Sequence, residues 1–433
     1  MKVLGIGADG RGHAYARMLA QSPLVTQIIW TPGNAGIGSE VVQKSGLPVW
    51  CFNVGVEDID GLLALAEYER PDVTVVSPEN SIIAGIADRF EARGFRIWAP
   101  NQKAARLEGS KAFAQKFMER YGIACPKGNF FTNPFIAFGY ADALNWNCAV
   151  KADGPCYGKG VTVCRDEIKA RWAICEALIK RKFGKAGDTI VIQELLEGNE
   201  LSLHFLCDGK TTLCLQSSVD YKKESDHKDA RNTGSMGAYS PDPSLSDEEL
   251  ASIASGIINP WTKGCESEGI NFKGILFPGV MRTAEGPKVL EFGVRGGSPE
   301  METHLVRLET DLMEIILATL EQRLDRLSLV WKPVVSVCVV MASPGYPGAY
   351  EPGKLITGLS IVEKMPNVKV FHMGTKRGDD GRVYTDGGRV LGVTAWADTL
   401  QNARVRAYDA VREITFEGGQ YFRKDIGGPP LWD

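Results

Sequence analysis

The chain has 433 residues, of which 44% are hydrophobic and 24% are charged, as is typical of a globular protein with two to four domains. Its formal net charge of −4 gives no reason to expect nucleic-acid binding, so any phosphate site has to be a local group of Lys, Arg and backbone amides. The ten cysteines form no Cys-x-x-Cys pair, which favours reduced thiols in the cytoplasm over zinc ligands. No apolar run reaches the ~18 residues of a membrane span, so we expect small-molecule partners and no membrane contact.

Residues 1–104 are predicted to form a doubly wound α/β domain. The pattern predicts a helix from Arg11 to Gln21, and it predicts strands over Lys2–Gly7, Ile28–Trp30, Val73–Val76 and Arg96–Trp98. Loops at the carboxyl ends of parallel strands are where such sheets bind ligands, so the segments that follow these strands are candidate binding loops.

Residues 105–330 are predicted to form an α+β domain. An amphipathic helix is expected to end near Tyr121, and a charged helix over 166–182 is expected between a strand at Lys151 and a strand over Thr189–Glu194. A helix over Asp311–Glu321 is expected to close the domain. Alternating patterns predict four more strands, over Leu201–Leu206, Thr211–Ser217, Gly274–Arg282 and Lys288–Phe292.

Residues 331–433 are predicted to form a small C-terminal domain. A strongly apolar strand follows Pro333 and ends at Met341, and two further strands are expected near Lys369 and Arg389.

A glycine-rich turn, Gly5-x-Gly7-x-x-Gly10, lies between the first strand and the first helix. This spacing is typical of dinucleotide sites, but such sites also need an acidic residue at the end of the second strand, and the first one here is Glu40. A single phosphate on the helix N-terminus beside Arg11 and His13 is the preferred interpretation. A tight turn without a ligand stays an alternative.

A second glycine-rich turn follows Lys151 and contains Gly158-Lys159-Gly160. Glycines allow backbone N–H groups to close on an anion and the lysines add charge, so the segment suits a polyphosphate. It lacks the spacing of a Walker A loop. Taken alone, the turn also fits a surface hairpin with a solvated lysine.

Two later segments also carry candidate chemistry. Small and hydroxyl residues over Asn232–Pro241, preceded by Asp220, Lys222, Asp226 and His227, predict a substrate-binding loop. Further on, Glu291 at a strand end can bind Mg²⁺ and Arg295 can clamp an anion, although such a pair is also common as a surface ion pair.

In this order, the motifs resemble the glycinamide ribonucleotide synthetase (phosphoribosylamine–glycine ligase) family of ATP-grasp enzymes over essentially the whole length. The resemblance implies an α/β N-terminal domain, an ATP-grasp core with a lid subdomain at about 123–195, and a small C-terminal domain. The matching segments are Pro32–Gly36, Leu107–Phe113, Val150–Gly154, Gly158–Gly160, Asn232–Pro241, Gly345–Gly348, Val370–Lys376, Gly387–Val390 and Arg423–Gly427.

The resemblance also implies roles for individual residues, with ATP and Mg²⁺ or Mn²⁺ as cofactors. The implied ATP contacts are Lys111, Lys151, Gly158, Lys159, Gly160, Glu194, Leu196 and Glu200, and the implied metal ligand is Glu291. The implied substrate-binding residues are Gly10, Arg11, Asn34, Glu79, Asp226, Gly234 and Lys376, and the implied catalytic residues are Arg295, Asp220 and Asn232. The implied reaction joins glycine to 5-phosphoribosylamine through a glycyl phosphate in purine biosynthesis, and we expect a monomer or a weak dimer.

The chain departs from the family pattern at positions expected to surround the metal and the amino-acid substrate. Gly293 replaces an asparagine ligand, Ser298 replaces an aspartate, Lys228 replaces an aspartate and Arg231 replaces a proline. These changes leave open a paralogue that joins a different carboxylate or amine, and also a non-catalytic nucleotide-binding relative.

Overall fold

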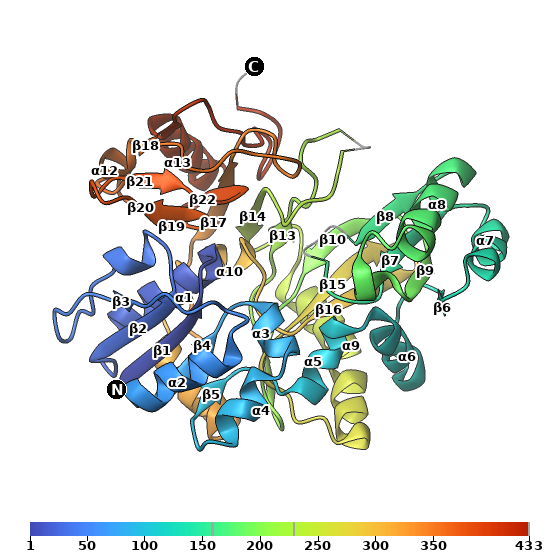
Figure 1. Cartoon of the computed structure of the whole chain (residues 1–433), viewed down its shortest axis with the longest axis horizontal. Helices are drawn as coiled ribbons and strands as arrows, with labels where there is room; N and C mark the ends of the chain where they lie inside the picture. Colours follow the sequence, from blue (N-terminus) through green and yellow to red (C-terminus); the bar gives the residue numbers. More distant parts are fainter. Residues whose placement is uncertain (157–159, 228–229, 432–433) are drawn as a thin grey trace.

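The computed structural model describes residues 1–156, 160–227 and 230–431. Figure 1 shows an N-terminal part in blue and a C-terminal part in red, with a green lid projecting from the central sheets on the opposite side. No helix in these ranges is long and apolar enough to cross a membrane.

The N-terminal part is a five-stranded parallel sheet in the order β3-β2-β1-β4-β5. The predicted strands at 2–7 and 73–76 are confirmed, and both are almost wholly buried, as expected of strands covered on both faces. The elements are β1 (Lys2–Gly7), α1 (Gly10–Gln21), β2 (Gln27–Pro32), β3 (Trp50–Cys51), α2 (Ile59–Glu69), β4 (Val73–Val76), α3 (Glu79–Ile83), α4 (Ile86–Glu91) and β5 (Ile97–Trp98).

Two helices, α5 (Gln102–Gly109) and α6 (Lys111–Tyr121), lead into the lid, an antiparallel sheet in the order β6-β9-β7-β8. The lid has a small hydrophobic core of its own, which includes Val150, Cys164 and Ile192. The predicted helix over 166–182 is shorter than expected, since α8 ends at Ile174 and one π-helical segment, Cys175–Ile179, follows. The lid elements are β6 (Gly128–Phe131), α7 (Pro134–Ala143), β7 (Cys148–Ala152), β8 (Val161–Cys164), α8 (Glu167–Ile174) and β9 (Ile190–Glu194).

The central sheet is built on one long strand, β15 (Lys273–Thr283), which pairs with β10, β11 and β16. The prediction of one strand over 201–206 is wrong: β10 and β11 pair with separate stretches of β15, and Leu203 and His204 lie between them. The elements are β10 (Asn199–Ser202), β11 (Phe205–Asp208), β12 (Thr212–Cys214), α9 (Asp247–Glu268), β16 (Gly286–Gly293), α10 (Glu300–Leu305) and α11 (Leu312–Leu320).

The C-terminal sheet has the order β13-β14-β17-β22-β19, so two short strands from the middle of the chain pair with strands from its end. Two small two-stranded sheets accompany it, the hairpin β20–β21 and the pair β18–β23. The elements are β13 (Val219–Asp220), β14 (Gly237–Ser240), β17 (Val335–Ala342), β18 (Ile356–Thr357), α12 (Leu359–Val362), β19 (Val368–His372), β20 (Thr375–Arg377), β21 (Val383–Thr385), β22 (Arg389–Ala397), α13 (Leu400–Glu413) and β23 (Thr415–Phe416).

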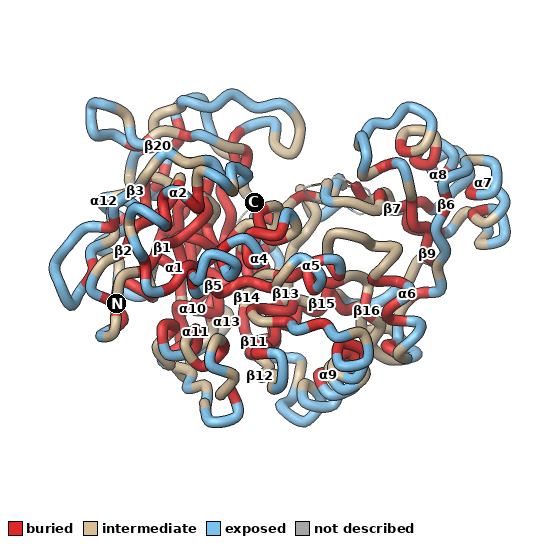
Figure 2. Tube along the Cα trace, turned by 60° about the horizontal axis from the view of Figure 1, so that its bottom comes forward, coloured by how far each residue is buried: buried red, intermediate tan, exposed pale blue. Residues whose placement is uncertain are grey.

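Buried residues run through the centre of the molecule where the N-terminal, central and C-terminal sheets approach one another, and exposed residues lie around them (Figure 2). Helix α10 lies in this buried centre and contacts α1, β14 and β17. The residues just before it, 295–299, therefore lie where all three parts meet.

Candidate active site

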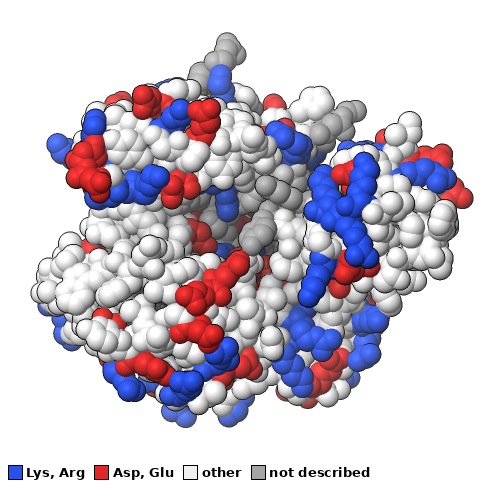
Figure 3. All heavy atoms as spheres, in the orientation of Figure 1, with Lys and Arg blue, Asp and Glu red and all other residues white. Residues whose placement is uncertain are grey.

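One face of the molecule is hollowed between the C-terminal part, the N-terminal part and the lid. Figure 3 shows Lys and Arg atoms on the lid beside this hollow and Asp and Glu atoms on the N-terminal side of it. Most of the predicted site residues come from segments that surround this region.

The glycine-rich turn after β1 is closed by hydrogen bonds within the protein. Asp9 caps α1, because its Oδ1 accepts hydrogen bonds from the backbone N of Gly12 (2.6 Å) and from Oγ of Ser77 (3.0 Å). Arg11 is almost fully buried, and its Nη2 lies 2.5 Å from Oδ2 of Asp9. A Cβ at Gly10 would overlap the Glu302 carboxyl group, so a larger residue there would require that side chain to move. The turn thus places a cation and helix N–H groups side by side.

The Arg11 guanidinium belongs to a partly buried charge cluster that joins the N-terminal part to the end of β16. Oε2 of Glu79 lies 3.7 Å from Nη2 of Arg11 and 3.3 Å from Nε of Arg295. Nη2 of Arg295 also pairs with Oε1 of Glu108 at 3.2 Å, and the other oxygen of Glu108 accepts a hydrogen bond from the backbone N of Val294. The two arginines hold the pKa of Glu79 at about 2 despite its burial.

Sequence reasoning missed Glu108. It lies inside the 107–113 segment that carries the family resemblance, but nothing in its own spacing indicated an arginine partner. Its carboxylate position follows only from the tertiary contact between α5 and the residues after β16.

The predicted nucleotide side of the site brings three lysines, Lys111, Lys151 and Lys222, close to Glu291. Lys151 on β7 is buried, and its Nζ donates to the backbone O of Leu290, next to Glu291. Burial lowers the pKa of Lys151 to about 8, although the Glu291 carboxylate opposes this shift. The three lysines hold the pKa of Glu291 at about 2, so this carboxylate is ionised at neutral pH.

Asp153 fixes the start of the second glycine-rich turn against α6. Its Oδ1 accepts from the backbone N of Ala112 (2.7 Å), and its backbone O accepts from the backbone N of Lys111 (3.0 Å). The backbone O of Gly160 accepts from the backbone N of Ala152 at 2.8 Å. Gly158 and Lys159, predicted to contact the ATP phosphates, lie outside the described residues.

The predicted adenine and ribose contacts lie where the chain leaves the lid. The backbone N of Glu194 donates to the backbone O of Lys127, and the backbone N of Leu195 donates to the backbone O of Asn147, which fixes the path of the chain to Leu196. Glu200, a few residues further on, forms a 3.0 Å ion pair with Lys222.

Asp220 lies on β13, which pairs with β14 at the end of the loop predicted to bind substrate. Its Oδ1 is buried and has no hydrogen-bond partner in the described chain. Burial, together with the negative charge of Glu300, raises the pKa of Asp220 to about 8.

The loop itself is tied to the C-terminal part. The backbone N of Gly234 donates to the Tyr346 hydroxyl (3.0 Å), and its backbone O accepts from Arg389. Asn232 forms a backbone bridge to Lys223, whereas Asp226 is exposed. The structure thus anchors Gly234 and Asn232 but leaves Asp226 at the surface.

Two predicted substrate residues, Asn34 and Lys376, lie at the contact between the N- and C-terminal parts. The Asn34 amide donates to the backbone O of Ala8 and of His372 and accepts from two backbone N–H groups, so its contacts close the turn. Lys376 is mostly exposed and pairs with Asp386 at 3.2 Å. Neither side chain contacts the Arg11–Glu79–Arg295 cluster.

Glu40, the first acidic residue after the second strand, binds two side chains of the protein itself. His13 Nε2 lies 3.1 Å from its carboxylate, and Lys369 Nζ lies 2.6 Å from it. These contacts give Glu40 a structural role between α1 and β19 in place of a ribose contact.

The structure describes three of the four positions at which the chain differs from the family pattern. Gly293 offers no side-chain ligand beside Glu291, and within 1–156, 160–227 and 230–431 no three His, Cys, Asp or Glu side chains form a metal-binding group. Arg231 pairs with Glu224 at 2.7 Å and is mostly exposed. The Ser298 hydroxyl donates to Glu302. Lys228 lies outside the described residues.

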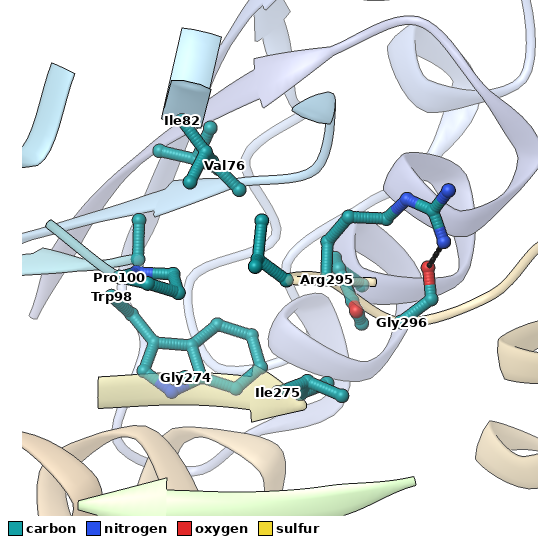
Figure 4. Close-up of a pocket in the computed structure, with 11 residues that line it drawn as sticks. Val76, Ile82, Trp98, Pro100, Gly274, Ile275, Arg295 and Gly296 are labelled. Atoms are coloured by element: carbon teal, nitrogen blue, oxygen red, sulfur yellow. Dashed lines mark hydrogen bonds between the residues drawn. The ribbon is translucent and has the colours of Figure 1, made fainter. Parts of the chain in front are cut away.

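A small cavity lies behind Arg295 and is lined by side chains that include Val76, Trp98 and Pro100 (Figure 4). Its volume of about 10 Å³ is on the scale of a single water molecule, so it cannot hold a substrate. The Arg295 guanidinium points away from this cavity towards the Gly296 carbonyl, which it meets at 3.4 Å (Figure 4).

Comparison with known proteins gives full-length matches. Three phosphoribosylglycinamide synthetase family models match in order: the N domain over 1–108, the ATP-grasp (A) domain over 109–301 and the C domain over 336–429. The phosphoribosylamine–glycine ligase of Caldanaerobacter subterraneus is 41% identical over 426 residues, 98% of this chain and 99% of the relative. The ligase of Escherichia coli K12 is 41% identical over 428 residues, 99% of this chain and 98% of the relative.

Solved structures agree with these matches. The Thermotoga maritima phosphoribosylamine–glycine ligase has a TM-score of 0.80 at 27% identity and covers 98% of this chain and 99% of its own. The biotin carboxylase domain of a Hydrogenobacter thermophilus 2-oxoglutarate carboxylase, solved with MgADP, has a TM-score of 0.74 at 15% identity, with 97% of this chain and 91% of that chain covered, and shares the fold. The expected fold, an α/β domain followed by an ATP-grasp core and a C-terminal domain, is confirmed.

Proposed function

Because the chain belongs to the phosphoribosylglycinamide synthetase family, we propose that it joins glycine to 5-phosphoribosylamine, giving glycinamide ribonucleotide, ADP and phosphate. It is an ATP-dependent carbon–nitrogen ligase of purine biosynthesis. The observation that carries the proposal is the position of β16, which ends between a lysine-rich group around Glu291 and the arginine cluster around Glu79. The alternatives of a different ligase or a non-catalytic relative are not favoured by full-length relatives that share one name.

On the nucleotide side, Lys111 and Lys151 would neutralise the ATP phosphates, and the 158–160 turn would cover them. Backbone groups over Glu194–Leu196 would hold the adenine, and Glu200 would hold the ribose. Glu291 is ionised and suits Mg²⁺, a cation that is commonly bound through one or two carboxylates, substrate phosphates and water. When bound there, Mg²⁺ would neutralise phosphate charge and orient the γ-phosphoryl group.

On the other side, the helix N-terminus at Gly10 and the Arg11 guanidinium would hold the phosphoribosyl group, with Glu79 and Arg295 beside it. Arg295 is held by two carboxylates, so its guanidinium is oriented before substrate arrives. Asp220, Asn232 and Gly234 would border the amino acid.

The reaction fits this arrangement. A carboxylate oxygen of glycine takes the γ-phosphoryl group from ATP, and ADP leaves. The amine nitrogen of phosphoribosylamine then attacks the carbonyl carbon, phosphate leaves, and the nitrogen loses a proton as the amide forms. The protein contributes positioning and charge neutralisation, and no covalent nucleophile is needed.

The experiment is an ADP-release assay with mass spectrometry of the product. We expect ADP release only when glycine and phosphoribosylamine are both present, and a product mass equal to glycinamide ribonucleotide. Other amino acids and simple carboxylates form the comparison panel. Turnover with another acid but not glycine would assign the chain to a paralogue, and MgATP binding without turnover on any acid would contradict the ligase assignment.

A further inference from the structure

The peptide group between Gly296 and Gly297 is held from both sides. Its carbonyl accepts hydrogen bonds from Arg11 Nη1 and from Arg295 Nη1. Its N–H donates to Nε2 of His204 at 3.0 Å. In a trans peptide the C=O and the N–H point in opposite directions, so His204 and the two arginines fix one orientation of this peptide plane.

The two glycines cannot fix that orientation by themselves. A Cβ at Gly296 would overlap Met301, and a Cβ at Gly297 would overlap the carboxyl group of Glu300, so the close packing requires glycine at both positions. A Gly–Gly peptide has the widest choice of backbone conformations, and its plane is therefore held by its hydrogen-bond partners.

His204 is placed to be a rigid acceptor. It lies in the break between β10 and β11, it is fully buried, and its backbone O accepts from the backbone N of Leu215. Its ring stacks on Phe277 with the centroids 4.3 Å apart and the planes 16° apart. Accepting from Gly297 with Nε2 places its proton on Nδ1, which has no partner in the described chain.

The electrostatic surroundings keep this histidine neutral. Burial lowers its pKa well below the usual value, and the neighbouring His304, Arg295 and Arg11 lower it further. A protonated ring would have no lone pair to accept the Gly297 N–H. The hydrogen bond therefore forms only with the neutral ring, and it stabilises that neutral form.

We propose that His204 is a positioning residue of the ligase: by accepting from the Gly297 N–H it keeps the Gly296 carbonyl directed at Arg11 and Arg295, and so holds both guanidiniums in place for the phosphoribosyl substrate. This inference rests on the proposed function.

The test uses the full chain with three variants. His204→Leu removes the acceptor at similar volume, His204→Gln restores an acceptor near the Nε2 position, and His304→Leu is the matched control. His304 is equally buried and its ring lies 5.2 Å from that of His204, but it hydrogen-bonds Ser240 instead of the 296–298 segment. Each protein is measured for the KM of phosphoribosylamine, for kcat, for the Kd of MgATP and for the Kd of ribose 5-phosphate by titration calorimetry.

We expect His204→Leu to raise the KM of phosphoribosylamine and the Kd of ribose 5-phosphate at least tenfold while the Kd of MgATP stays within twofold. His204→Gln should recover most of the loss, and His304→Leu should change the ribose 5-phosphate and MgATP affinities in equal proportion or not at all. An unchanged ribose 5-phosphate affinity in His204→Leu, or an equal loss of MgATP affinity, overturns the inference. Absence of turnover in the unmodified enzyme contradicts the proposed function instead, and the ribose 5-phosphate titration still decides the role of His204.

Discussion

The Ser298 hydroxyl donates a 2.6 Å hydrogen bond to Oε1 of Glu302, while Oε2 of the same carboxyl group has no partner in the described chain. Burial raises the pKa of Glu302 from its ordinary value of 4.5 to about 7. Between these two values the unfolded chain releases this proton and the folded chain keeps it. The contribution of Glu302 to stability therefore falls as the pH rises from about 4.5 to about 7 and stays constant above that.

We predict that Glu302→Gln stabilises the protein at pH 8 by up to about 3 kcal/mol, the free energy that corresponds to this pKa shift. The amide keeps an acceptor for Ser298 and removes the cost of a buried charge. Urea unfolding at pH 5 and pH 8 measures the effect, which should be much smaller at pH 5. The exposed Glu363→Gln is the control, and equal gains for both variants would contradict the prediction.

Replacing Lys151 by Ala should weaken MgATP binding at least tenfold, since a hydrogen bond to a charged group is worth about 1.5–3 kcal/mol. The free enzyme has a Lys151 pKa of about 8 and only the protonated amine neutralises phosphate, so the MgATP affinity of the unmodified protein should fall as the pH rises from 7 to 9. Titration calorimetry at three pH values checks both statements. Lys169→Ala, on the exposed face of the lid, should bind normally; a pH dependence that survives in Lys151→Ala would assign it to another group.

Gly293→Asn should lower the Mg²⁺ concentration needed for activity, because it adds an amide oxygen beside Glu291. A Cβ at this position would lie 3.2 Å from Phe277 and 3.3 Å from Arg295 Nη1, so the fit is tight but needs shifts of only a few tenths of an ångström. A Mg²⁺ titration of the steady-state rate is the measurement. Gly256→Asn, placed in open space on α9, should not alter it, and an unchanged requirement in Gly293→Asn would place the metal elsewhere.

The sequence motifs placed Arg295 and Arg231 near the substrates, but replacing them should have effects of very different size on the kinetics. Arg295→Ala removes two partly buried ion pairs, which leaves Glu108 without its arginine and Glu79 with Arg11 alone, so kcat/KM for phosphoribosylamine should fall at least a hundredfold, about 3 kcal/mol. Arg231→Ala removes one exposed pair with Glu224 and should change the KM of glycine less than threefold. Steady-state kinetics distinguish the two, and a large rise in the glycine KM of Arg231→Ala would show that this side chain reaches the substrate.

The fold was predictable where strands are buried on both faces or helices carry one apolar face. Strands β1 and β4 and helix α6 fall at their expected residues. Helix α9, by contrast, was not predicted, because Gly256, Pro260 and Gly264 interrupt its pattern, although Ser246 and Glu249 form a capping box that marks its start. The pairing of β13 and β14 with C-terminal strands depends on contacts between distant residues, which periodicity cannot show.

For the site, the motifs indicated which charged residues belong to it, but they did not indicate which residues form ion pairs or hydrogen bonds with them. Lys151 and Arg295 both lie close enough to Glu291 to lower its pKa, while the roles predicted for the three residues stay predictions. Glu108 and His204 do not stand out in any motif, because their roles come from a single tertiary contact each. Lys376 and Asp226 were predicted to bind substrate, but both side chains lie at the surface, although the Val370–Lys376 segment matches the family.

The chain enters and leaves the lid at adjacent points, since the backbone N of Glu194 donates to the backbone O of Lys127 and the backbone N of Lys127 donates to the Glu194 carboxylate. A segment whose two ends already meet can be removed or exchanged without stretching the rest of the chain, and its loop-closure cost depends only weakly on its length. With a hydrophobic core of its own, the lid is thus a modular insertion. The length of the lid loops could therefore change without moving the chain at Lys127 and Glu194, where the lid joins the rest of the fold.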